Sequence, residues 1–179
     1  SLGYSKELIQ KITLSGLVHD VGKSKIDIDI LNAPRRLTTE EFEHIRNHVV
    51  YGKEICLNSK IVDDDILGGV LFHHERYDGL GYVEGRKGEN IPLFGRIISV
   101  SDVFDALTSQ RVYKKSWNHY KVISHIIQNS QKMFDPEFSS SMIRVFGMYP
   151  PGTRVKLNDY RIGTVVASRK DNEMQPIVQ

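Results

Sequence analysis

Apolar residues recur every three to four positions along most of this chain, a spacing typical of helices that pack one face into a core. Residues 6–22 predict a first helix, which Gly22 would end. Thr38 and Glu41 have the spacing of a capping box and predict a helix from there to about Leu57. Further helices are expected over residues 61–74, 91–111, 117–132 (capped by Ser116) and 136–147.

Two connections and a C-terminal tail interrupt this helical pattern. Residues 23–37 are rich in turn formers, and residues 75–90 form a glycine-rich loop of a length that is more often functional than idle. The run 149–152, Tyr-Pro-Pro-Gly, is the clearest break, and β-rich segments follow it at 153–157, 161–168 and 176–178. We therefore expect a mainly α fold, with a helical domain over residues 1–148 and a small β-strand extension over 149–179.

Composition and charge exclude several classes of protein. The chain has 179 residues, with 24 Lys or Arg against 22 Asp or Glu, so its net charge of +2 gives no reason to expect DNA or a membrane surface as a partner. The single cysteine, Cys56, excludes a disulfide scaffold and fits a cytoplasmic location. The longest apolar run, residues 66–72, is too short for a membrane span, and no signal peptide is visible.

The doublet His19-Asp20 at the end of the first predicted helix is the strongest chemical signal. Adjacent side chains on a helix diverge by about 100°, so these two can reach neighbouring metal ions, and a carboxylate can bridge such ions. A second doublet, His73-His74, follows another predicted helix, and its two imidazoles also point in different directions. Together with His48 and Asp102, these residues predict a dinuclear hydrolytic site.

Spacing alone leaves some residues ambiguous. His44 and His48 are four residues apart, so they are either a chelating pair or one ligand beside a surface residue. Asp105, three residues after Asp102, either orients a ligand or is a structural acid. His119 and His125 have no acidic or histidine neighbour at ligand spacing and are interpreted as structural.

The chain resembles the HD-GYP branch of the HD phosphohydrolase superfamily over residues 8–147. The motifs that carry the resemblance are 19–23 (HDVGK), 48–52 (HVVYG), 73–82 (HHERYDGLGY) and 101–108 (SDVFDALT), followed by Arg111 and Tyr113. The resemblance implies an HD-type helical bundle, a centre of two or three metal ions, and hydrolysis of the bacterial second messenger cyclic di-GMP to pGpG or GMP. It also implies diguanylate cyclase (GGDEF) domains, an upstream sensory or receiver domain and a second copy of the chain as partners.

The same resemblance assigns roles to individual residues. Divalent transition ions, iron or manganese by family analogy, would be held by His19, Asp20, His48, His73, His74 and Asp102, with Asp20 as the bridge. Lys23 would act with Asp20 in catalysis, at the scissile phosphate or the departing oxygen. Substrate contacts would come from Arg111, Lys114, Tyr82 and Asp78, while Asp105 and Glu75 would support the ligands. Tyr82 either packs on a guanine or anchors its loop, and the basic pair has the alternative of a solvated helix end.

This chain departs from the family pattern in three places. Val83 and Val49 stand where prolines are expected, and Val83 leaves the Gly-Tyr-Pro motif incomplete and its loop less restrained. The family usually supplies a further Glu and His from a helix upstream of the His-Asp doublet, which we expect to be missing here, so a third metal ion is in doubt. The alternatives are therefore an impaired module that senses cyclic di-GMP or binds a protein, and a phosphohydrolase of another nucleotide.

Overall fold

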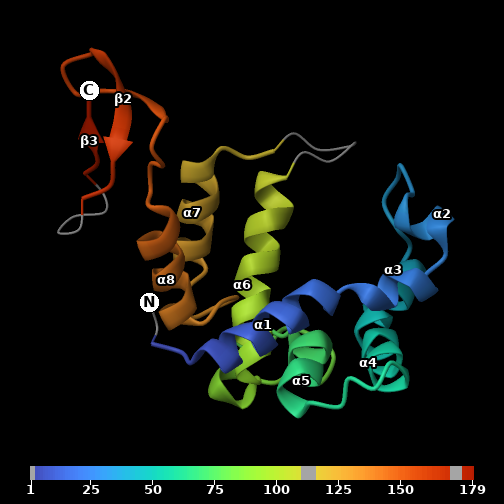
Figure 1. Cartoon of the computed structure of the whole chain (residues 1–179). Coiled ribbons are helices and arrows are strands. Elements are labelled where there is room, and N and C mark those ends of the chain that lie inside the picture. Colours follow the sequence, from blue (N-terminus) through green and yellow to red (C-terminus); the bar gives the residue numbers. More distant parts are fainter. Residues whose placement is uncertain (1–2, 110–115, 170–174) are drawn as a thin grey trace. The chain divides into compact units, whose positions relative to one another are not determined.

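The computed structural model describes residues 3–109, 116–169 and 175–179. The expected mainly α fold with a small β extension is confirmed (Figure 1). The chain divides into two compact units, which are described separately. Unit 1 comprises Ser1–Asp102 with Gln131–Asp135, and unit 2 comprises Val103–Ser130 with Pro136–Gln179. Within the described part of the chain, no helix is both long and apolar enough to cross a membrane.

Unit 1 is built from short helices whose starts follow local capping rules. Ser5, Thr38 and Asp63 each accept a backbone hydrogen bond at the start of a helix, and Thr38 and Glu41 complete the expected capping box. The elements are α1 (Lys6–Val18), η1 (Val21–Lys25), α2 (Ile28–Leu31), α3 (Thr39–Arg46), α4 (His48–Asn58), α5 (Asp64–Phe72), η2 (Gly88–Asn90) and the start of α6 (Leu93–Thr108).

The core of unit 1 holds the ends of α1, α4 and α5 in fixed positions. Cys56, Leu67 and Val70 form one buried cluster, and Ile66, Phe94 and Ile98 form another. Inside the unit, Ser15 of α1 donates a buried hydrogen bond to the carbonyl of Ile66 on α5, 2.9 Å away. Burial of these side chains stabilises the packing of α1 against α5. His19 directly follows α1, and His73 directly follows α5.

Two glycines allow η1 to pack against α4. A Cβ atom on Gly22 would overlap the carbonyl oxygen of His48 and the amide nitrogen of Gly52. Gly52 is less tightly confined, since a Cβ there would lie 3.0 Å from Val70 Cγ1 and 3.5 Å from the amide nitrogen of Gly22. This close approach of the two backbones brings His19 and Asp20, which precede η1, next to the first turn of α4.

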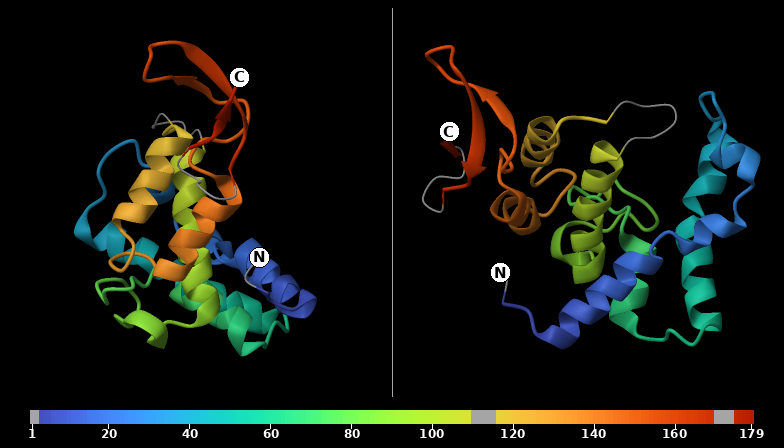
Figure 2. Two further views of the ribbon diagram at one scale, coloured as in Figure 1. Left: turned by 90° about the vertical axis from the view of Figure 1, so that its left-hand side faces the viewer. Right: turned by 45° about the horizontal axis from the view of Figure 1, so that its top comes forward.

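Unit 2 combines the rest of α6 with two amphipathic helices and an antiparallel sheet. Helix α7 (His119–Gln128) packs against α8 (Pro136–Phe146) through buried side chains that include Val122, Ile126 and Phe138. The strands β1 (Arg154–Lys156), β2 (Ile162–Ala167) and β3 (Ile177–Val178) follow, in the order β1-β2-β3 (Figure 2). Along β2 the buried Gly163 and Val165 alternate with exposed residues, as expected of a strand that buries one face.

Several element boundaries differ from the sequence-based expectation. The helix predicted from Thr38 to Leu57 is two helices, because the chain turns at Asn47, whose N–H reaches the carbonyls of His44 and Ile45. The cap of α7 is Asn118 rather than Ser116, since the Asn118 side chain accepts from the amide of Lys121. The predicted connection 23–37 contains the short helix α2. Whether residues 149–179 form a domain of their own stays a prediction.

Candidate metal centre

Asp20 lies at the centre of the six predicted ligands, at the turn between α1 and η1. Its Oδ1 atom is 3.3 Å from Nε2 of His48 and 3.9 Å from Nε2 of His73. Its Oδ2 atom instead lies 3.4 Å from Nε2 of His19. The two oxygens of one carboxylate therefore face different imidazoles.

The ligand atoms form two groups that share this carboxylate. One group is Asp20, His48, His73 and His74, and the other is His19, Asp20 and Asp102. Within each group all ligand atoms lie within 4.8 Å of one another. Ligands about 2.1 Å from one ion are separated by about 3–4 Å, so either group has the dimensions of a metal-binding site. The structure thus brings all six predicted ligands together inside unit 1.

Backbone carbonyls set the orientation of three of the four imidazoles. In each case Nδ1 contacts the carbonyl oxygen three residues earlier: Gly16 for His19 at 2.6 Å, Ile45 for His48 at 2.7 Å and Val70 for His73 at 2.9 Å. A carbonyl only accepts, so Nδ1 of each neutral ring carries the proton. The lone pair of each ring is then on Nε2, the atom that faces Asp20 or its neighbours.

Burial and neighbouring charge give His73, His74, Asp20 and Asp102 the protonation states that metal binding requires. Burial lowers the pKa of His73 well below its usual range, and neighbouring imidazoles lower it further. Burial likewise lowers the pKa of His74, to about 3. Burial raises the pKa of Asp20 and Asp102, but their histidine neighbours, and Lys23 at Asp20, outweigh it and leave both carboxyls ionised. At neutral pH, His73 and His74 therefore offer neutral nitrogens and Asp20 offers a charged oxygen.

The second group shows the attraction of this site for positive charge. Burial opposes protonation of His19, but the carboxylates of Asp102 and Asp20 outweigh it and raise its pKa to about 10. The ring nitrogen Nε2 lies 3.8 Å from Asp102 Oδ1. A negative potential strong enough to hold a proton on this ring would attract a divalent cation equally well.

The donor atoms fit a divalent transition metal. His19 Nε2 and Asp20 Oδ1 are buried without a hydrogen-bond partner. His48 Nε2 and His73 Nε2 are 3.4 Å apart, and in the neutral rings, which carry their proton on Nδ1, two lone pairs face each other. A cation bound between such atoms would replace the missing hydrogen bonds and remove the repulsion between the lone pairs. A nitrogen and carboxylate set without thiolate suits iron, manganese, cobalt, nickel or zinc.

Tyr82 and Glu75 hold the glycine-rich loop after α5 against the ligands. The ring of Tyr82 stacks on His74, with centroids 4.9 Å apart and planes at 24°, and its amide donates to the His74 carbonyl. Gly81 permits this approach, because a Cβ there would overlap the backbone of residues 74–76. Buried Glu75 accepts hydrogen bonds from the amides of Glu84 (2.7 Å) and Gly85 (2.9 Å), which fixes the far side of the loop.

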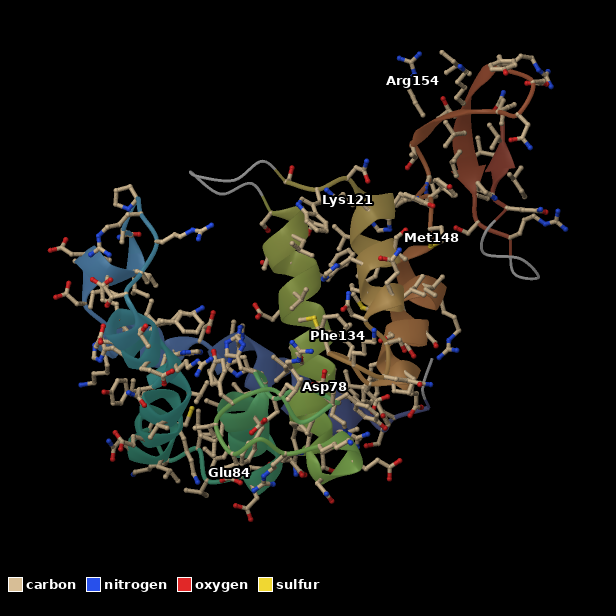
Figure 3. All side chains as sticks on the ribbon, turned by 180° about the vertical axis from the view of Figure 1, so that it is seen from behind. Asp78, Glu84, Lys121, Phe134, Met148 and Arg154 are labelled. Carbon is tan, nitrogen blue, oxygen red and sulfur yellow. The ribbon has the colours of Figure 1, made fainter. Side chains whose placement is uncertain are left out.

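The remaining predicted site residues lie in different settings. Lys23 is 40 % exposed and its ammonium contacts Asp20 Oδ2, so a positive charge stands beside the shared carboxylate. Asp78, labelled with Glu84 in Figure 3, is paired with Arg76 (2.6 Å) and accepts from the Leu80 amide, so its carboxylate organises a turn. Asp105 is exposed and accepts from Ser109. The predicted phosphate-binding pair, Arg111 and Lys114, lies outside the described residues.

The other histidines have no place in the two ligand groups. His44 contacts the ring of Tyr51, which leaves His48 as the ligand from this pair. In unit 2, His119 bonds to the carbonyl of Gly147 and His125 packs against Trp117. The structural interpretation of these two residues agrees with these contacts.

Sequence reasoning missed Arg46. Its guanidinium carbon lies 4.7 Å from the ring centroid of Phe42 and 4.9 Å from that of Tyr82. The spacing of Phe42 and Arg46, four residues apart on a helix, was a signal for the first contact. The second joins α3 to a loop far along the chain and has no local signal.

In unit 1, imidazole and carboxylate side chains form two ligand groups around one aspartate. This arrangement is that of a helical metal-binding protein. The comparison with known proteins identifies it further: the chain belongs to the HD domain family, whose model matches residues 1–138. The resemblance seen in its motifs is thereby confirmed, and with it the expectation that this domain binds divalent metal ions.

Two relatives and one solved structure illustrate this similarity. A cyclic di-GMP phosphodiesterase of Pseudomonas aeruginosa is 37% identical over 96% of this chain, which spans 41% of that protein. A 3'3'-cGAMP-specific phosphodiesterase of Vibrio cholerae is 36% identical over 67% of this chain, which spans 23% of that protein. The crystal structure of a cyclic GMP-AMP-specific phosphodiesterase of V. cholerae shares the fold, with a TM-score of 0.58 and 19% identity over 80% of this chain and 39% of that one.

Proposed function

We propose that the protein is a metal-dependent phosphodiesterase that hydrolyses cyclic di-GMP to pGpG or GMP. The observation that carries the proposal is the division of Asp20: one carboxylate oxygen faces His48 and His73, and the other faces His19. This is the geometry required of a bridging ligand in a two-metal site. The name of the relative from P. aeruginosa supports the choice of substrate.

In the proposed reaction each residue has a role set by its position. A pair of divalent ions at such a site supplies activation of water and neutralisation of charge on a phosphate. Asp20 would hold both ions, and the Nδ1 contacts of His19, His48 and His73 orient these rings so that their Nε2 atoms would serve as ligands. Lys23 places its ammonium next to Asp20, where it meets the scissile phosphate or the departing oxygen.

Around this centre we propose that Tyr82, Asp78, Arg111 and Lys114 contact the dinucleotide. Glu75 and Asp105 are proposed as supporting residues, and the contacts of Glu75 with the Tyr82 loop favour this role. Iron or manganese is the proposed metal by analogy with the HD-GYP family, and a donor set of nitrogen and oxygen without thiolate is compatible with both. Proposed partners are diguanylate cyclase domains, a sensory or receiver domain, and a second copy of the chain, in the cytoplasm.

The experiment is a product assay on the full-length protein loaded anaerobically with Fe(II) or with Mn(II). Cyclic di-GMP should disappear and pGpG or GMP should accumulate on a chromatogram. Asp20→Ala should abolish turnover, whereas His44→Ala, outside both ligand groups, should retain it. An inactive loaded protein, or an Asp20→Ala variant as active as the wild type, would overturn the proposal.

A second candidate keeps the site and changes the nucleotide. The 36% identity to a 3'3'-cGAMP-specific phosphodiesterase favours it, as does Val83, which stands where the Gly-Tyr-Pro motif has proline. Equal concentrations of cyclic di-GMP and 3'3'-cGAMP in one reaction distinguish the two candidates. Preferential loss of cyclic di-GMP supports the first, and preferential loss of 3'3'-cGAMP supports the second. Binding of either dinucleotide by the loaded protein without turnover would instead indicate a sensor.

A further inference from the structure

His74 differs from the other three ligand histidines in the way its ring is held. The rings of His19, His48 and His73 are each fixed by a backbone carbonyl three residues earlier. Among the described residues, no carbonyl plays this part for His74, whose ring contacts are with other aromatic rings. An imidazole that coordinates a metal needs a neighbour that fixes its orientation.

The neighbour that lies flat against His74 is Tyr82. The near-parallel stacking of these rings, at 24°, contrasts with the 77° between His74 and His48. Tyr82 therefore sets the plane in which the His74 ring can lie. The Tyr82 ring must itself be held, because its loop has valine at position 83 in place of a proline that would restrict the backbone.

Arg46, from α3, is in contact with the Tyr82 ring. Its guanidinium lies 4.9 Å from the Tyr82 centroid and 4.7 Å from the Phe42 centroid, so it connects two aromatic rings from separate parts of unit 1. Glu43 bonds the same guanidinium at 2.8 Å. The Nε atom of Arg46 is buried without a hydrogen-bond partner, so this part of the guanidinium is held by packing, to which the two ring contacts contribute.

We propose that Arg46 is a positioning residue of the metal centre: stacked between Phe42 and Tyr82, it holds the Tyr82 ring against His74 and thereby orients that ligand. The proposal deepens the proposed function and rests on His74 being a ligand. A planar guanidinium can stack on rings as the compact ammonium of lysine cannot. Arg46 acts only through Tyr82 and touches neither substrate nor metal.

The test measures metal binding, so it does not depend on phosphodiesterase activity. Mn(II) is titrated into chelator-treated protein by calorimetry, and Co(II) absorption spectra report the ligand geometry. Arg46→Met, which keeps the length of the side chain without its charge, should weaken one class of site about tenfold, the lower range for loss of a supporting partner. The Co(II) bands of that site should shift. In an active enzyme, kcat should fall more than KM rises.

Matched variants separate positioning from general stability. Glu43→Gln removes the ion pair but leaves both ring contacts, so its metal affinity should stay within about twofold of wild type. Tyr82→Phe keeps the stacking ring, so its metal affinity should also stay within about twofold of wild type. Tyr82→Leu should lose as much metal affinity as Arg46→Met. The double variant, Arg46→Met with Tyr82→Leu, should be no weaker than either single variant, because both break the same chain of contacts.

Two results would overturn the inference. Unchanged Mn(II) affinity and Co(II) spectrum in both Arg46→Met and Tyr82→Leu would show that His74 needs no such support. Additive losses in the double variant would show that Arg46 acts independently of Tyr82. If Arg46→Met fails to fold, the Tyr82→Phe and Tyr82→Leu pair still decides whether the stacked ring orients the ligand. Absence of turnover with intact metal binding would reject the proposed function and leave this inference standing.

Discussion

His48 and His73 bring their Nε2 atoms within 3.4 Å of each other, although each ring donates its Nδ1 proton to a backbone carbonyl. When both rings are neutral with the proton on Nδ1, two buried lone pairs face each other at this distance and repel. The folded chain therefore holds the two nitrogens in an arrangement that a cation would stabilise. Their helices are held together by buried contacts of α4 with α5, so the arrangement belongs to the fold itself.

Metal should therefore raise the stability of the folded protein. At a Mn(II) concentration 100 times the dissociation constant, binding stabilises the native state by about 2.7 kcal/mol, which corresponds to a rise in Tm of roughly 5–10 °C for a protein of this size. Thermal unfolding with and without Mn(II) measures this. Asp20→Ala removes the residue that both ligand groups share and should lose the rise. An equal rise in that variant would show that the ions bind elsewhere.

Acid should destabilise the metal-free protein before any carboxylate titrates. The pKa of His74 is lowered from 6.5 to about 3, so the unfolded chain takes up a proton below pH 6.5 that the folded ring refuses. The contribution of His74 to stability is thus complete above pH 6.5 and is lost as the pH falls towards 3. His73 contributes in the same direction. His19 contributes in the opposite direction, because its pKa is raised to about 10: its stabilisation is fully present below pH 6.5 and is lost as the pH rises towards 10.

Urea unfolding of chelator-treated protein at pH 7.0 and pH 5.0 measures this acid sensitivity. His74→Phe removes one of the titrating groups, so the free energy of unfolding should fall between pH 7.0 and pH 5.0 by about 1 kcal/mol less than in the wild type. The upper limit for one proton is about 1.4 kcal/mol per pH unit. His44→Phe, from the histidine that lies outside both ligand groups, is the control and should behave as the wild type. Identical pH dependence in all three proteins would contradict the assignment.

Gly22→Ala should be strongly destabilising, because the added Cβ overlaps the backbone of His48 and Gly52 and forces η1 away from α4. We expect a loss of about 3 kcal/mol or more in urea unfolding, the upper range for overpacking. Gly16→Ala is the matched control: a Cβ there meets nothing within 4 Å, and alanine favours a helix interior. A mild effect at residue 22 would mean that the close approach of the two backbones is wrong.

Glu75→Ala should release the loop that carries Tyr82. The amides of Glu84 and Gly85 lose their acceptor, a loss of about 1–3 kcal/mol, and should exchange hydrogen faster. Hydrogen–deuterium exchange followed by mass spectrometry reads these amides directly. Glu84→Ala changes the neighbouring side chain but leaves the amide donor in place, so protection should persist. Unchanged exchange in Glu75→Ala would show that this carboxylate does not secure the loop.

The sequence predicted the mainly α fold and the two ligand doublets because those signals are local, whereas the place of His48 in the site came from the family resemblance. Capping residues and apolar spacing lie within a few positions of each other, as do the two residues of the doublets His19-Asp20 and His73-His74. The turn at Asn47 was missed because the residues on either side of it all favour helix. That turn starts a new helix at His48, with the His48 ring bonded back to Ile45.

Contacts between distant segments could not be predicted from spacing. Tyr82 had two interpretations in the sequence, and its stacking on His74 depends on where the loop crosses the end of α5. Asp78 has a motif position that suggests substrate, yet its carboxylate bonds Arg76 and the Leu80 amide. Arg46 escaped notice because a lone arginine on a polar helix face usually contacts solvent.

The most direct test of a carboxylate shared by two ions is electron paramagnetic resonance of the protein loaded with Mn(II). Two Mn(II) ions bridged by Asp20 should give two ions per chain by metal analysis and the broad, multiline spectrum of an exchange-coupled pair. His19→Ala, which removes a ligand from one group only, should leave the six-line spectrum of a single ion. One ion per chain, or two ions without coupling, in the wild-type protein would contradict the bridging role of Asp20.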